Sequence, residues 1–137
     1  MAAEGVCLDH ISRETSNLKA LANFYQETLG FERIEAPKFT EFELVWLRLS
    51  PSLTLHLIER DPESNLVLRE SASSVVRDPS KCPRQNHLGF GVSNYNQFVA
   101  SLKKNGIQIH ECVRPDGKTK QAFFFDPEGN GLEVFSL

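Results

Sequence analysis

Two histidines occupy the same position in a sequence frame that the chain contains twice. "LDHISRETSN" holds His10 and "QNHLGFGVSN" holds His87, so a histidine, an Ile or Leu and a Ser-Asn pair recur 77 positions later. The same offset pairs His56 in "LTLHLIE" with Glu133 in "NGLEVFSL". Imidazole and carboxylate groups are common ligands of divalent metals, so the repeated pattern could assemble a metal centre.

Each of these residues alone has an ordinary structural explanation. A single histidine on a strand is more often hydrogen-bonded or exposed than a ligand, and a glutamate near a chain end is usually solvated. Strand alternation strengthens the metal hypothesis, because it places His56 on the opposite face from its leucine neighbours and separates Glu133 from its apolar neighbours in the same way. Polar groups at equivalent points of two facing sheets are costly to bury unless a metal satisfies them together.

The repeated frames also predict the elements that would position these side chains. In the first frame Ser16 or Asn17 can cap a helix that ends at Gly30, and in the second Ser93 or Asn94 can cap a helix that "NG" would end. Strand-like runs follow each helix: "FERIEA", "FELVWLRLS" and "LTLHLIE" after the first, and "IQIHECV", "QAFFF" and "GLEVFSL" after the second. Each half therefore predicts a β-α-β-β-β module, in an α+β fold.

The expected organisation is a single domain over residues 1–137. The first module covers 6–59 and the second 87–137, with a connection of 60–86 whose low periodicity suits a mobile segment or one folded over a site. A four-stranded sheet with one helix leaves its other face needing cover, so two such modules commonly pack about a pseudo-twofold axis. The two uncovered faces would then look at each other.

Composition excludes several classes of function. The formal net charge of −3 arises from 15 basic and 18 acidic residues without a basic stripe, so nucleic acid is not an expected partner. No apolar run reaches the roughly 20 residues that span a bilayer, and the first residues do not resemble a secretory signal. We therefore expect a cytoplasmic protein with no membrane partner, in which the 3 cysteines are reduced thiols.

Four motifs carry a resemblance to a known superfamily: "DHI" at 9–11, "FYQETLGF" at 24–31, "NHLGF" at 86–90 and "FFFDPEGNGLEVF" at 123–135. With these motifs the chain resembles the vicinal oxygen chelate (VOC) superfamily over nearly everything from Val6 to Leu137. That superfamily contains glyoxalase I, fosfomycin-resistance proteins, methylmalonyl-CoA epimerase and extradiol dioxygenases. The resemblance implies two βαβββ modules in a pseudo-twofold fold, a small-molecule substrate and an assembly that allows a homodimer.

The resemblance also implies a ligand set of His10, His56, His87 and Glu133, with one residue from the first and one from the last strand of each half. Such a set suits zinc, nickel, cobalt, manganese or iron. In glyoxalase I the metal stabilises the enediolate formed from the hemithioacetal of a 2-oxoaldehyde and glutathione, which makes glutathione a candidate co-substrate. Glu133 would be the proton-shuttling carboxylate, and His56 stands where the usual glyoxalase has a second catalytic glutamate.

The residues expected to contact the substrate give opposing indications about glutathione. "PDGKTKQAFFF" resembles a glyoxalase loop in which a basic residue binds a glutathione carboxylate, so Lys118 and Lys120 are candidates, with Arg84 as a further cation. An ordinary role as surface cations is an equal alternative for all three residues. On the first helix, "FYQETLG" puts Glu27 where glyoxalases commonly have an arginine, and this charge reversal should repel a substrate carboxylate.

Three functions remain open at this point. The first is a metal-dependent lyase or isomerase of the lactoylglutathione lyase type. The second is an iron(II) enzyme similar to extradiol dioxygenases, for which His10, His87 and Glu133 would form a facial triad. A fourth ligand at His56 would weigh against it, because oxygen and a catecholate need open positions. The third is a VOC ligand-binding protein without turnover, which the missing second glutamate favours.

Overall fold

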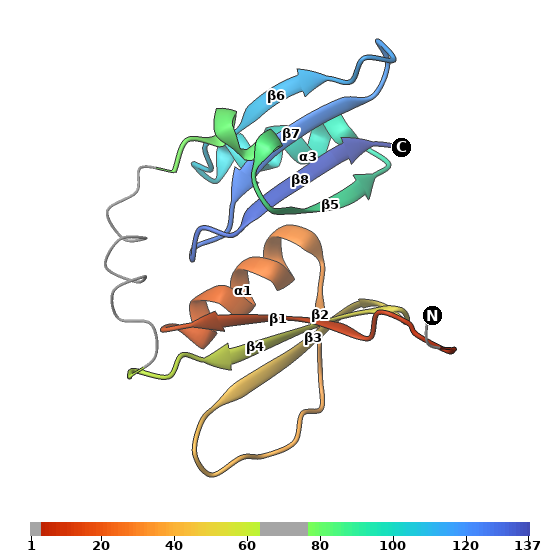
Figure 1. Ribbon diagram of the computed structural model, residues 1–137. Coiled ribbons are helices and arrows are strands. Elements are labelled where there is room, and N and C mark those ends of the chain that lie inside the picture. The colour runs from red at the N-terminus through yellow and green to blue at the C-terminus, as the bar shows by residue number, and fades with distance from the viewer. Residues whose placement is uncertain (1–3, 64–76) are drawn as a thin grey trace. The chain divides into compact units, whose positions relative to one another are not determined.

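The first half of the chain forms one four-stranded mixed sheet and one helix (Figure 1). The structure is a computed structural model, and it describes residues 4–63 and 77–137. The elements are β1 (His10–Thr15), α1 (Leu18–Leu29), β2 (Glu32–Ile34), β3 (Leu44–Ser50) and β4 (Leu53–Glu59). The strand order is β1-β4-β3-β2, in which β1 runs parallel to β4 and the other pairs are antiparallel.

The second half repeats this architecture. Its elements are β5 (His87–Val92), α3 (Tyr95–Lys104), β6 (His110–Val113), β7 (Lys120–Phe125) and β8 (Gly131–Ser136). The strand order is β5-β8-β7-β6, again with the first and last strands parallel. The predicted α+β fold of two βαβββ modules is confirmed, and the modules fall into two compact units, Met1–Leu66 and Val67–Leu137.

The two sheets share one register. The equivalent cross-strand pairs are His10–Thr54 with His87–Gly131, and Trp46–His56 with Phe123–Glu133. Each residue of the second sheet in these pairs lies 77 positions after its counterpart in the first. Because one slip of register would move every side chain to the other face, this agreement confirms that the repeated frame encodes the same geometry twice.

Side-chain alternation gives each sheet a buried face, which the helix covers, and a second face. The second face carries His10 and His56 in the first sheet and His87 and Glu133 in the second. The residues buried on the helix side include Leu21 and Tyr25 of α1, Val45 and Leu47 of β3, and Leu55 and Leu57 of β4. In the second unit they include Val99 and Leu102 of α3, Ala122 and Phe124 of β7, and Leu132 and Val134 of β8. Burial of these apolar side chains fixes the strands and thereby aims the alternate residues at the opposite face.

Both helices begin at the predicted asparagines. The side chain of Asn17 accepts a hydrogen bond from the Ala20 amide at 3.0 Å, and that of Asn94 accepts one from the Gln97 amide at 3.3 Å. Gly30 ends α1 with a φ of 75°, a left-handed conformation that suits glycine. None of the helices in the described part of the chain is long and apolar enough to cross a membrane.

Replacing Asn17 with alanine should lower the free energy of unfolding by about 1 kcal/mol, because the Ala20 amide loses its acceptor. Urea denaturation followed by circular dichroism measures this change. Asn17→Asp is the matched control, since it keeps an oxygen at the capping position and should be close to neutral. An equal loss in both variants would show that the cap is not the cause.

The connection between the sheets is more ordered near its end than its sequence predicts. A 3-10 helix, η1 (Pro79–Arg84), follows Asp78, whose side chain accepts from the Ser80 amide at 2.9 Å. Hydrogen bonding with Ser80, first by its side chain and then by its backbone amide, lowers the pKa of Asp78. Cys82 of η1 is fully buried, and this burial raises the pKa of its thiol and makes the thiol less reactive. The predicted connection of 60–86 includes residues 64–76, which lie outside the described part of the chain.

Candidate functional site

In the first unit, His10 and His56 lie side by side on adjacent parallel strands. Their rings stack with centroids 4.0 Å apart and an interplanar angle of 13°, and Trp46 stacks on the other side of His56 at 4.1 Å. Burial lowers the pKa of His56, nearby His10 acts in the same direction, and Asp9 opposes them. A lowered pKa favours the neutral imidazole, which is the form that binds a metal.

Hydrogen bonding assigns the free nitrogen of His10. Its Nδ1 lies 2.7 Å from Oδ2 of Asp9. A carboxylate can only accept, so Nδ1 carries the hydrogen and the neutral ring keeps its lone pair on Nε2. Metal-bound histidines commonly have a carboxylate or carbonyl at the other ring nitrogen, which holds the ring in position and raises its basicity. The contact with Asp9 therefore leaves Nε2 of the neutral His10 ring as the atom that could bind a metal.

His87 has the equivalent arrangement in the second unit. Its Nδ1 lies 2.8 Å from the backbone oxygen of Gln85, which can only accept, so Nδ1 is again the donor. Its Nε2 lies 3.2 Å from Oε2 of Glu133. In the neutral ring both of these facing atoms carry lone pairs, and two such acceptors are stable together only with a proton or a cation between them.

Glu133 is buried, with 7% of its surface exposed, and each of its oxygens has a separate environment. Oε1 accepts from Nε2 of Gln121 at 2.6 Å and from Nη2 of Arg114 at 3.2 Å. The Arg114 guanidinium lies 4.7 Å from the centre of the Phe135 ring, which holds it in place. Oε2 faces His87. The hydrogen bonds to Oε1 therefore hold the carboxylate in place, and Oε2 is the oxygen that points toward His87.

Sequence reasoning missed both Arg114 and Gln121. Gln121 could have been found, because β7 and β8 form the "DPEGN" hairpin and alternation puts Gln121 on the face of Glu133. Arg114 follows the end of β6, at the start of the turn that holds the lysines, and its sequence position carries no comparable signal. Their contacts show that protein groups already compensate much of the charge of Glu133.

The donor chemistry of these residues fits a divalent metal. Two ligand atoms each about 2.1 Å from one metal lie roughly 3 Å apart, which matches the 3.2 Å between His87 and Glu133. In the described part of the chain no three His, Cys, Asp or Glu side chains gather into one metal-binding group. Each unit supplies a pair, His10 with His56 and His87 with Glu133, and the four-ligand centre stays a prediction.

The predicted substrate contacts lie at three different places. Arg84 is exposed at the end of η1, and Lys118 is exposed in the turn before β7. Lys120 donates to Oδ1 of Asn96 at 3.1 Å and lies 5.9 Å from the Tyr95 ring, so it points toward α3 and away from the face of Glu133. These contacts of Lys120 are with Asn96 and Tyr95, and neither is with His87 or Glu133.

The turn that contains Lys118 has its own fixed structure. Asp116 accepts from the Lys118 amide at 2.8 Å and from the Thr119 amide at 2.9 Å, and its Oδ2 accepts from the Thr119 hydroxyl. These hydrogen bonds, with that of Thr119 foremost, lower the pKa of Asp116 to about 2. The turn thus presents Lys118 on a rigid loop next to Arg114.

Comparisons with known proteins agree with this architecture. Residues 7–134 match the profile of the Glyoxalase/Bleomycin resistance protein/Dioxygenase superfamily. No curated protein sequence gives a match. The solved structure of a glyoxalase family protein from Enterococcus faecalis is similar over 93% of this chain and 95% of its own, with 28% identity and a TM-score of 0.64.

Two further solved structures share the fold at lower identity. Lactoylglutathione lyase from Agrobacterium tumefaciens is 18% identical, with 98% of this chain and 96% of its own covered and a TM-score of 0.64. TnmS3, an antibiotic binding protein from Streptomyces sp. CB03234, is 17% identical, with 98% of each chain covered and a TM-score of 0.68. One fold therefore supports both a lyase and a binding protein.

Proposed function

Because this chain belongs to the Glyoxalase/Bleomycin resistance protein/Dioxygenase superfamily, we propose that it is a metal-dependent enzyme of the glyoxalase I type. Its substrate would be a small molecule with vicinal oxygens, of which the hemithioacetal of a 2-oxoaldehyde and glutathione is one candidate. The observation that carries this proposal is the contact of His87 with Glu133. Their facing acceptor atoms, 3.2 Å apart, can be satisfied by a proton or by a divalent metal, and we assign the metal.

The proposed ligands are His10, His87 and Glu133, with His56 as a fourth. A bound divalent metal would polarise a carbonyl and the adjacent hydroxyl of the substrate. Glu133 would take the proton at Oε2 from the carbon that bears the hydroxyl and return it to the former carbonyl carbon, while the hydroxyl proton would pass to the former carbonyl oxygen. Gln121 and Arg114 would hold Oε1 throughout, so the carboxylate would not need to reorient between the two transfers.

A ligand-binding protein without turnover is the second candidate, and the surroundings of Glu133 favour it. The Arg114 guanidinium and the Gln121 amide both donate to Oε1, so the carboxylate already has protein partners without a substrate. His56 also stands in place of the second glutamate of glyoxalases. In this alternative the metal or the polar pair would bind a small molecule and leave it unchanged.

Elemental analysis of protein purified without added metal tests the proposal first. We expect about one zinc, nickel, cobalt or manganese ion per chain. Iron as the bound metal would favour the dioxygenase alternative, and activity would then be assayed on catechols in place of aldehyde adducts. A bound metal without turnover of either aldehyde adducts or catechols would favour the ligand-binding protein. Absence of metal, together with no binding on titration, would contradict the metal centre itself.

Replacing Asp9 with alanine should weaken metal binding by about 10- to 100-fold, because His10 would lose the group that orients its ring and fixes its tautomer. Isothermal titration with Zn²⁺ measures the change. Glu41→Ala is the matched control, since Glu41 is an exposed carboxylate of the same unit that is not among the predicted ligands. Unchanged affinity in Asp9→Ala would remove His10 from the ligand set.

A further inference from the structure

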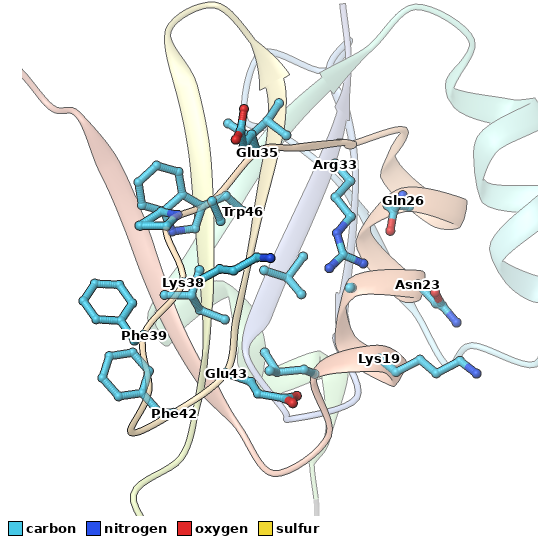
Figure 2. Close-up of a pocket in the computed structure, with 17 residues that line it drawn as sticks. Lys19, Asn23, Gln26, Arg33, Glu35, Lys38, Phe39, Phe42, Glu43 and Trp46 are labelled. Carbon is cyan, nitrogen blue, oxygen red and sulfur yellow. The ribbon is translucent and has the colours of Figure 1, made fainter.

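A cavity of about 850 Å³ lies in the first unit, between α1 and the segment that joins β2 to β3 (Figure 2). None of the four proposed metal ligands lines it. Its volume falls in the range of about 300–1,000 Å³ that is typical of small-molecule sites. The cavity is therefore large enough for a ligand of its own.

Charged side chains surround this cavity with a small positive excess. Three cations line it, Lys19, Arg33 and Lys38, against two carboxylates, Glu35 and Glu43. Figure 2 shows the Arg33 guanidinium and the Lys38 amine directed into the space between the helix and the strands. Within residues 4–63 and 77–137 neither of these two side chains has a hydrogen-bond or ion-pair partner. Both can therefore bind an anion without breaking an existing contact.

The apolar part of the lining suits a ring or chain. Phe39 and Phe42 stack with centroids 4.9 Å apart and an interplanar angle of 16°, and 49% of the Phe39 surface is exposed. Ala22 and Val45, both buried, also line the cavity. Exposed aromatic faces beside apolar side chains gain free energy when a ligand ring covers them.

We propose that this cavity is a separate binding site for a small organic anion that has one negative charge and an apolar ring or chain. Arg33 and Lys38 bind the anionic group, and Phe39 and Phe42 contact the apolar part. A second negative charge is disfavoured, because Glu35 and Glu43 would lie near it and only one positive charge is in excess. None of the proposed metal ligands lines the cavity, although one lining residue, Trp46, stacks on His56.

Isothermal titration with three naphthalene probes tests this assignment on protein treated with EDTA. 2-Naphthoate, a monoanion, should bind more tightly than uncharged 2-naphthylmethanol and than the dianion 2,6-naphthalenedicarboxylate. Arg33→Gln combined with Lys38→Gln should weaken 2-naphthoate binding by about tenfold or more, because hydrogen bonds to charged groups are lost. Phe39→Ala should weaken both 2-naphthoate and 2-naphthylmethanol.

A charge-matched double variant, Arg48→Gln with Lys104→Gln, should bind 2-naphthoate normally, because neither residue lines the cavity. His87→Ala should also bind it normally, which separates this site from the proposed metal centre. Absence of 2-naphthoate binding would overturn the proposal. An equal loss in the two double variants would also overturn it, and so would equal affinity for the dianion.

Discussion

Replacing His87 with alanine should weaken Zn²⁺ binding by more than about a hundredfold, and His10→Ala should cause a comparable loss. A residue that only orients a ligand contributes about 10- to 100-fold to metal affinity, so loss of a ligand atom should exceed that range. Both histidines have Nδ1 held by an acceptor, Asp9 or the Gln85 carbonyl, and both present Nε2. Isothermal titration of each variant measures the effect.

The chain contains its own control for this experiment. His110 is the fourth of the 4 histidines and pairs with Phe123 in the second sheet, but it is not among the proposed ligands. His110→Ala should therefore retain the affinity of the unaltered protein. Normal binding in either His10→Ala or His87→Ala would refute a metal shared by the two halves. A loss confined to one of them would place the metal in a single module.

The second large effect concerns the substrate. If Glu27 occupies the arginine position of a glutathione pocket, as the resemblance implies, it places a negative charge beside a substrate carboxylate, and a partly desolvated like-charge contact costs several kcal/mol, or a factor of hundreds in binding. Turnover of the methylglyoxal–glutathione hemithioacetal by the unaltered protein should therefore be weak. Formation of the thioester should rise in Glu27→Arg, and rise again when His56→Glu restores the second glutamate.

Glu41→Arg makes the same charge change on an exposed loop of the same unit and should leave turnover unchanged. Efficient turnover by the unaltered protein would contradict the roles given to Glu27 and His56. The threshold is a kcat/KM within the ordinary enzyme range of about 10⁴ to 10⁸ M⁻¹s⁻¹. The activity would then be that of a lactoylglutathione lyase, with a substrate pocket built differently from the one the resemblance implies.

The two modules could be predicted from the sequence because local signals agree with each other. Both helices begin at an asparagine of the repeated Ser-Asn pair, and α1 ends at the predicted Gly30. The registers of both sheets follow from the same offset that pairs His56 with Glu133. When capping, periodicity and turn residues all indicate one structure, the sequence determines it strongly.

The immediate surroundings of the candidate site could be predicted only in part. The contacts of Glu133 with Arg114 and Gln121 join residues 19 and 12 positions away, and they depend on the register of β7 with β8 and on the path of the following turn. The tautomers of His10 and His87 depend on single hydrogen bonds to Asp9 and to a backbone carbonyl. Strand alternation could indicate Gln121, but hydropathy and spacing carry no information on the Arg114 contact or the tautomers, since they record residue type and position and not side-chain direction.

Trp46 gives this protein an optical property of its own. It is the only tryptophan in the chain, and its ring lies parallel to that of His56 at 4.1 Å, with an angle of 4° between the planes. A protonated imidazole in contact with an indole quenches its fluorescence more strongly than a neutral one. Because all of the tryptophan emission comes from one residue in contact with His56, we expect its intensity to follow the charge of that imidazole, without a dye or an introduced label.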